Sequence, residues 1–337
     1  PHYLLEPART NSVLYSEDFS NAAWAGAAVT RELNQIISPD GSLNGVKISA
    51  SAAFAQIQQT YTSINDADYT LSLFAKLPSS NVVGLRLASG SNDVRREFNL
   101  STLSIQSMGG NNQELIDEGI ENYGNGWYRI FLTCKADGTS AFLNIYPKNS
   151  SDTTLQSVFI FGAQLEQGSY PTSYIPTNGT AITRAAETAN GSGDAATFND
   201  SEGVLMAEIA NSETITGSYL GICNGSSNER LIIGNEGGLL RVYTDVFVSG
   251  SVQSANKDFN KIAVKYNSSN TSIYYNGFLI KSINASANLS GINESKFTSG
   301  GSAQNFYGKT RELQYFDSAL TDAQLETLTS WTSLQEM

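Results

Sequence analysis

The sequence predicts an all-β protein built from two antiparallel β-sandwiches, and three observations predict this fold class. Apolar and polar residues alternate over many short runs, which is the period of a half-buried strand. Clusters of Gly, Asn, Asp, Ser and Pro separate these runs at short intervals. Only 15% of the residues are charged, against about a quarter in an average domain. At 337 residues the chain can bury two cores of ordinary size, so we expect two domains.

The first domain is predicted to span residues 1–176 and to form a jelly roll. No long amphipathic helix is visible before residue 175. Regularly spaced strands without helices between them favour an antiparallel sandwich. We expect its clearest strands within residues 56–76, 82–100, 128–134, 141–146 and 158–165.

Residues 162–186 join the first domain to the second. Pro171 and Pro176 fix their own φ angles and bias the residues before them toward extended conformations. We therefore expect a stiff extended strap rather than a flexible tether. Residues 177–200 are poor in large apolar side chains and are predicted to be a linker and a loop leading into the second domain.

The second domain is predicted to span residues 201–337. Asn276-Gly277 separates two apolar runs and favours a two-residue type I′ hairpin, because both residues tolerate positive φ. Thr321 and Gln324 have the spacing of a capping box and predict one short C-terminal helix. Other strands are expected within residues 203–210, 219–223, 230–234, 239–248, 261–266 and 311–316.

Three motifs resemble a module that recurs in bacteriophage virion proteins, among them tail and head fibre or spike proteins. They read LLEPARTNSVLYSEDFSNAAW at residues 4–24, YGNGWYRI at 123–130 and GAQLEQGSYPTSYIPTNGTAITRAA at 162–186. The resemblance implies a non-enzymatic structural or adhesive component of a virion. The resemblance names no ligand, but it implies a homo-oligomer such as a trimer. As a hypothesis, we expect other virion proteins and host surface polysaccharide as partners.

The second domain has a further resemblance. Over residues 203–331, the order of an Asn-Gly hairpin, a strand and the helix sequence LTDAQLETLTSW resembles the end of laminin-G-like and concanavalin-A-like lectin domains. The jelly roll expected before it resembles carbohydrate-binding modules. Both resemblances imply lectin-like folds.

The charge of the chain argues against two classes of partner. A net charge of −12 and a pI of about 4.6 repel phosphate backbones and anionic lipid headgroups. The sequence contains no run of eighteen apolar residues that could span a membrane. We expect neither nucleic-acid binding nor membrane insertion.

The residues also argue against an enzyme. His2 is the one histidine of the chain and lies near its first residue, so Ser-His-Asp, Cys-His and His-zinc sites cannot be assembled. Cys134 and Cys223 fall in different predicted domains and on apolar strands, which favours two buried free thiols.

A glycoside hydrolase would need only two carboxylates, so a polysaccharide depolymerase remains an alternative. Adjacent pairs such as Glu17-Asp18 and Asp117-Glu118 are common in solvated loops. Glu208 lies in an apolar strand, but the sequence around it, MAEIAN, lacks the partner carboxylates of concanavalin-A-like glucanases. We expect no catalysis.

Two kinds of binding site remain. Structural calcium is often held between the first and last strands of jelly-roll modules, and Glu17 or Asp18 beside Gln164 or Glu166 would match that place. Sugars stack on exposed aromatic rings while their hydroxyls bond to amides. The candidate sugar-binding rings are Trp24, Tyr219, Tyr243 and Tyr307.

Together these observations predict a non-enzymatic virion adhesion protein, on the tail or the capsid, that binds host surface glycans through several copies at once. A purely architectural capsid or tail decoration protein is the main alternative, because the same inert sandwiches would serve it.

Overall fold

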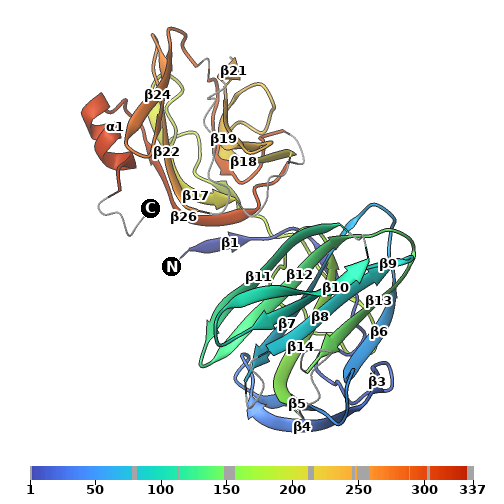
Figure 1. Cartoon of the computed structure of the whole chain (residues 1–337). Coiled ribbons are helices and arrows are strands. Elements are labelled where there is room, and N and C mark those ends of the chain that lie inside the picture. Colours follow the sequence, from blue (N-terminus) through green and yellow to red (C-terminus); the bar gives the residue numbers. More distant parts are fainter. Residues whose placement is uncertain are drawn as a thin grey trace. The chain divides into compact units, whose positions relative to one another are not determined.

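The computed structural model describes residues 2–77, 82–111, 114–147, 156–211, 216–244, 247–248, 258–287, 289–301 and 304–331. The chain folds into two compact units (Figure 1). Unit 1 contains Pro1–Pro7 and Ala186–Met337, and unit 2 contains Ala8–Ala185. Each unit pairs two six-stranded antiparallel sheets, and one short helix lies near the C-terminus. The predicted all-β fold of two sandwiches is confirmed.

Unit 2 contains two sheets and a small ladder. Sheet 2a has the order β10-β9-β8-β13-β6-β3, sheet 2b has the order β11-β12-β7-β14-β5-β4, and β15 pairs with β2. The strands of sheet 2a are β3 (Ala25–Ala27), β6 (Gln56–Thr62), β8 (Val82–Ser89), β9 (Asn92–Asn99), β10 (Ser104–Asn111) and β13 (Ser140–Tyr146). Those of sheet 2b are β4 (Val29–Ile37), β5 (Leu43–Ala50), β7 (Asp68–Lys76), β11 (Leu115–Gly124), β12 (Trp127–Lys135) and β14 (Ser157–Gln167). The ladder joins β2 (Arg9–Asn11) to β15 (Ile182–Arg184).

The core of unit 2 lies between its two sheets, and the period of two explains why. Leu71, Leu73 and Ala75 alternate along β7 and are buried, as are Leu85 and Leu87 of β8. The chain passes between the sheets from β5 to β6, β7 and β8, and again from β12 to β13 and β14, as in a jelly roll. The alternation of apolar and polar residues along each strand therefore gives each sheet one apolar face, and the two apolar faces form the core.

The strap lies over the outer face of sheet 2b, where a buried asparagine holds it. The Asn11 side chain donates hydrogen bonds to the carbonyl oxygens of Ala163 (3.1 Å) and Ile175 (2.8 Å). Its Oδ1 accepts from the backbone N–H groups of Val13 and Leu165, both at 3.1 Å. All the hydrogen-bonding capacity of one buried amide thus joins the N-terminal segment, the end of β14 and the strap.

Glu166 and Gln164 of β14 hold the strap at a second point. The Glu166 carboxylate accepts hydrogen bonds from the Thr172 N–H (2.6 Å) and hydroxyl (2.7 Å) and from the Gln164 amide (2.8 Å). Gln164 Oε1 accepts from the Ile175 N–H at 2.7 Å. The Arg129 guanidinium donates to the Thr172 carbonyl oxygen at 2.6 Å. We call Asn11, Arg129, Gln164, Glu166 and Thr172 the strap clasp.

Unit 1 is the second sandwich. Sheet 1a has the order β1-β26-β17-β22-β23-β24, and sheet 1b has the order β16-β25-β18-β19-β20-β21. The strands of sheet 1a are β1 (Tyr3–Leu5), β17 (Gly203–Asn211), β22 (Asn260–Tyr266), β23 (Thr271–Tyr275), β24 (Phe278–Ile283) and β26 (Gly308–Phe316). Those of sheet 1b are β16 (Asn190–Ser192), β18 (Thr216–Cys223), β19 (Arg230–Glu236), β20 (Leu239–Tyr243), β21 (Phe247–Val248) and β25 (Glu294–Lys296).

Local signals placed the hairpin and the helix correctly. Asn276 and Gly277 have φ angles of 48° and 91°, and Tyr275 pairs with Phe278 across the two-residue turn. Helix α1 (Asp322–Thr329) has the predicted capping box between Thr321 and Gln324. The helix covers the outer face of sheet 1a, where its buried Leu325 joins apolar residues of β17, β22 and β23.

The structure divides the chain differently from the predicted ranges 1–176, 177–200 and 201–337. Residues 1–7 belong to unit 1, where β1 pairs with β26 (Figure 1). The expected linker supplies two edge strands, β15 to unit 2 and β16 to unit 1. These strands have three residues each, so they are too short to show a period of two. The expected strand at 239–248 contains β20 and β21, with residues 245–246 outside the described part.

Candidate functional site

A cleft of about 540 Å³ opens at one edge of the unit 1 sandwich. One wall is formed by β1 and β26 of sheet 1a, and the other by β16 and β25 of sheet 1b. Core residues Leu205, Ile222 and Leu313 reach its floor. Each wall includes the edge strand of its sheet, β1 or β16, so the interior of the sandwich is accessible there.

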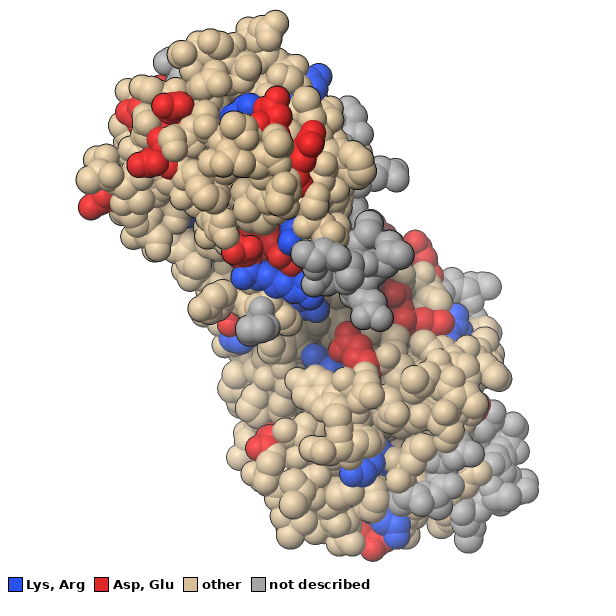
Figure 2. Space-filling view, turned by 90° about the vertical axis from the view of Figure 1, so that its left-hand side faces the viewer, with Lys and Arg blue, Asp and Glu red and all other residues tan. Residues whose placement is uncertain are grey.

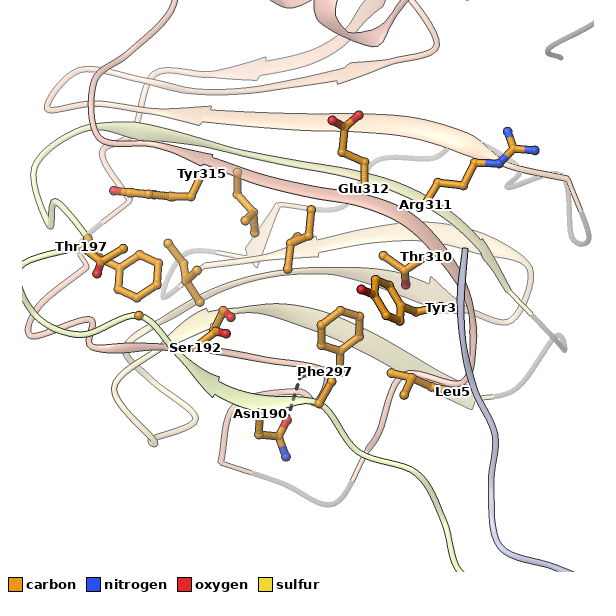
Figure 3. A pocket seen from close by; sticks show the side chains of 17 residues that line it. Tyr3, Leu5, Asn190, Ser192, Thr197, Phe297, Thr310, Arg311, Glu312 and Tyr315 are labelled. Carbon is orange, nitrogen blue, oxygen red and sulfur yellow. Dashed lines mark hydrogen bonds between the residues drawn. The ribbon is translucent and has the colours of Figure 1, made fainter. Parts of the chain in front are cut away.

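Aromatic rings stand along the cleft. Figure 3 shows Tyr3 toward one end and Tyr315 toward the other, with Phe297 between the walls. Tyr3 is 80% exposed, while Phe297 and Tyr315 are partly buried. Phe198 packs edge-on against Tyr315, with ring centroids 5.0 Å apart. The cleft therefore offers flat apolar surfaces of the kind that bind the C–H faces of a ligand.

Neutral polar groups accompany the rings. The side-chain oxygen of Asn190 accepts a hydrogen bond from the Phe297 N–H at 3.0 Å, which fixes the amide at the mouth of the cleft. Ser192 and Ser295 add hydroxyls from the same wall. The Thr310 hydroxyl of the opposite wall is buried and has no hydrogen-bond partner among the described residues.

The predicted sugar-binding aromatics lie elsewhere, and two of them are buried. Trp24 is 1% exposed, packs on Phe19 and donates its indole N–H to the Tyr15 carbonyl oxygen at 2.8 Å. Tyr219 is 3% exposed. Neither ring therefore presents a face to a sugar.

The other two predicted aromatics are partly exposed. The ring of Tyr243 contacts that of Tyr219 with centroids 5.5 Å apart, and its hydroxyl donates to Glu236 at 2.7 Å. Burial raises the pKa of the Tyr243 hydroxyl, and its bond to Glu236 adds to that shift. The Tyr307 hydroxyl accepts from the Asn305 amide at 3.0 Å. Neither Tyr243 nor Tyr307 lines the cleft.

The structure gives the predicted calcium ligands other partners. Gln164 and Glu166 are fully buried in the strap clasp, with both oxygens of Glu166 accepting hydrogen bonds. Burial raises the pKa of the Glu166 carboxyl, and the two bonds from Thr172 oppose that rise. These groups fasten the strap.

Glu17 and Asp18 line a separate hollow of about 490 Å³ in unit 2. Glu17 accepts a hydrogen bond from the Tyr174 hydroxyl at 3.2 Å, and Asp18 accepts from the Ser20 hydroxyl at 2.6 Å. In the described part of the chain, no three His, Cys, Asp or Glu side chains are grouped in a way that could hold a metal ion.

The side chains considered as catalytic or reactive groups are either paired or buried in the structure. Glu208 forms an ion pair with Arg311 at 2.9 Å. Cys134 and Cys223 are buried free thiols, which confirms the prediction for them. The face shown in Figure 2 is mostly uncharged and carries small groups of acidic and basic side chains. Among the described residues no helix is long and apolar enough to cross a membrane.

No model of a protein family and no curated protein matches the sequence. Three similar solved structures have TM-scores of 0.28 to 0.36. The carbohydrate-binding module CBM40 of the Ruminococcus gnavus IT-sialidase, bound to α2,3-sialyllactose, is 16% identical over 43% of this chain and 97% of the module (TM-score 0.36). Domain 4 of the Geobacillus stearothermophilus arabinanase AbnA, in complex with arabinotriose, is 16% identical over 45% of this chain and 74% of the domain (0.33). Domains LG4-5 of the mouse laminin α1 chain are 11% identical over 83% of this chain and 89% of theirs (0.28).

The similar structures thus include a carbohydrate-binding module and laminin G domains.

Sequence reasoning missed every aromatic residue of the cleft. Its lining comes from segments near residues 3–5, 189–198, 205, 222, 295–297 and 310–315, which are far apart in the chain. One local signal was available. Leu313 and Tyr315 alternate on the last strand and both pack toward the core, so a ring facing the sandwich interior at Tyr315 could have been predicted.

Proposed function

We propose that this chain is a non-catalytic adhesion protein that binds a glycan in the unit 1 cleft. The observation that carries the proposal is the composition of the cleft, where exposed and half-buried aromatic rings stand beside neutral hydrogen-bonding groups in about 540 Å³. Such a volume falls within the usual range of small-ligand pockets. Stacking on rings combined with hydrogen bonds to amides and hydroxyls suits a sugar better than a purely apolar ligand.

The biological setting that we propose is the surface of a phage particle, as part of a tail or head fibre or spike. The sequence motifs at residues 4–24, 123–130 and 162–186 support this setting through their resemblance to virion proteins. A single edge cleft gives modest affinity, so adhesion would use several copies in a symmetric homo-oligomer such as a trimer. Host surface polysaccharide and other virion proteins would be the partners.

Glycan binding is tested with the full chain on an array that holds neutral and anionic bacterial and host glycans, followed by calorimetry on the best binder. Tyr3→Ala removes an exposed ring of the cleft and should raise Kd about two- to tenfold, since such ring contacts contribute about 0.5–1.5 kcal/mol. Phe278→Ala is the matched control, because Phe278 is also an exposed ring of unit 1 but lies outside the cleft. Absence of binding to every glycan, or equal losses in both variants, would reject the proposal.

The virion setting has its own test. Antibody labelling of phage particles under the electron microscope should place the chain on fibres or spikes. Labelling only within the capsid wall would favour the architectural alternative.

A further inference from the structure

The charged side chains at the cleft are directed away from it. Of the described residues that line the cleft, Arg311 and Glu312 alone are charged, and Figure 3 shows both side chains pointing away from Phe297 and Leu5. A β-bulge at this point in the pairing of β17 with β26 explains the arrangement. Glu208 pairs with Glu312 and Ile209 with Thr310, so Arg311 has no opposite residue.

Arg311 is also occupied by other contacts. Its guanidinium forms the 2.9 Å ion pair with Glu208 and lies 3.8 Å from the ring centroid of Phe259. The interior of the cleft therefore presents only neutral donors and acceptors from the described residues. An anionic sugar would lose its hydration without gaining a cationic partner.

Thr310 has a buried hydroxyl that the free protein does not use. The residue is 4% exposed, and its Oγ1 has no hydrogen-bond partner in the part of the chain that the structure describes. Buried polar atoms are nearly always hydrogen-bonded, because an unpaired one retains the free-energy cost of its lost hydration. An unpaired hydroxyl in the wall of a cleft therefore points to a missing partner.

The position of Thr310 shows where that partner would lie. Thr310 and Tyr3 are directly opposite each other in the pairing of β26 with β1, and opposite residues of antiparallel strands project from the same face. Tyr3 is largely exposed, so its ring can move to open the position beside it. A sugar stacked on Tyr3 would have a ring hydroxyl within reach of Thr310, and a hydroxyl can both donate and accept.

We propose that the cleft is specific for a neutral glycan and that the Thr310 hydroxyl anchors the sugar residue that stacks on Tyr3. This inference rests on the proposed glycan binding and adds the ligand class and the anchoring atom. Thr310 then determines specificity, because a sugar that places a hydroxyl at this point gains a hydrogen bond and binds more tightly.

The test compares Thr310→Val with Thr271→Val in the full chain. Both replacements remove a buried hydroxyl of unit 1 while nearly keeping the shape of the side chain. The Thr271 hydroxyl donates to the Ala285 carbonyl oxygen at 3.2 Å, whereas the Thr310 hydroxyl is unpaired. Each variant is measured for Tm and for Kd toward the tightest-binding glycan of the array.

The two variants should respond in opposite ways. Thr310→Val should keep or raise Tm, because it removes an unpaired buried group, and should raise Kd about tenfold through the lost hydrogen bond. Thr271→Val should lower Tm and leave Kd unchanged. Thr310→Ser keeps the hydroxyl and should keep binding. A lowered Tm for Thr310→Val would contradict the unpaired state, and an unchanged Kd would remove Thr310 as the anchor.

The array separates this inference from the function on which it rests. Binding that Tyr3→Ala weakens but Thr310→Val does not would leave the glycan-binding function standing and overturn the anchor. Tighter binding to sialylated, uronic or phosphorylated glycans than to neutral ones would overturn the ligand class. No binding to any glycan would reject the function itself, and this inference with it.

Discussion

Replacing Asn11 with Ala should strongly destabilise unit 2, because Asn11 is the central residue of the strap clasp. The side chain is fully buried and makes four hydrogen bonds of 2.8–3.1 Å to backbone groups of three separate segments. Each buried hydrogen bond contributes about 0.5–1.5 kcal/mol net, which sums to about 4 kcal/mol for the four. A domain of this size loses about 2–4 °C in Tm for each kcal/mol, so Tm should fall by about 8–16 °C.

The assay is calorimetry of the full chain together with tryptophan fluorescence, because Trp24 and Trp127 both report on unit 2. Asn122→Ala is the matched control. Asn122 is exposed and accepts a single hydrogen bond from the described residues, from the Gly124 N–H at 2.9 Å. Its loss should cost no more than about 1 kcal/mol. Equal shifts for the two variants would refute the claim that the clasp holds the strap on sheet 2b.

Three further predictions concern charge, thiols and the first strand. Burial opposes ionisation of Asp93, but Arg95 and Arg86, at 2.5 and 2.6 Å, lower its pKa below the usual value. A lowered folded pKa gives stability that is present above the unfolded pKa, about 4, and is lost as pH falls through the folded pKa. Urea unfolding at a series of acidic pH values should therefore show that the free energy of unfolding falls less steeply with pH for Asp93→Asn than for the wild type. Equal slopes would exclude a contribution of the Asp93 carboxylate to stability. Burial raises the pKa of Cys134 to about 12 and also raises that of Cys223, so iodoacetamide at pH 8 should label both thiols in denaturant and neither in the native chain, as mass spectrometry would show. Deleting β1 removes two half-buried leucines, Leu4 and Leu5, and three strand pairs, which should lower the stability of unit 1 by about 1.5–3 kcal/mol and abolish glycan binding while unit 2 melts as before; intact binding would exclude β1 from the site.

Features set by neighbouring residues were predictable from the sequence. The alternation along β7 and β8, the Asn276-Gly277 turn and the Thr321 cap each depend on a few adjacent positions, and the structure contains all of them. The free thiols followed from apolar strand positions in separate domains. Local physical chemistry thus accounts for these alternating strands, the class of fold and the helix.

Features that depend on how the chain folds back on itself were not predictable from the sequence. Trp24 follows small polar residues, a pattern that favours exposure, but its ring is buried in the core of unit 2 and packs on Phe19. Glu166 has a carboxylate that could bind a metal ion. In the structure, however, the strap turns back over β14, and Thr172 of the strap occupies this carboxylate with two hydrogen bonds. The strand β1 is far in sequence from its partner β26, and no pattern in three residues could indicate the pairing.

The sequence motifs and the cleft involve different residues with different roles. Asn11, Arg129, Gln164, Glu166 and Thr172 all lie within the three motifs that resemble virion proteins, and in the structure they meet in one buried clasp. The resemblance thus concerns residues that hold a jelly roll and its strap together. Apart from Leu5, the residues that line the cleft lie outside the motifs. A chain that keeps the clasp but differs at the cleft would therefore fold unit 2 in the same way and, under the proposed function, bind another glycan. This separation would allow an adhesion protein to change its target without losing the module that the motifs specify.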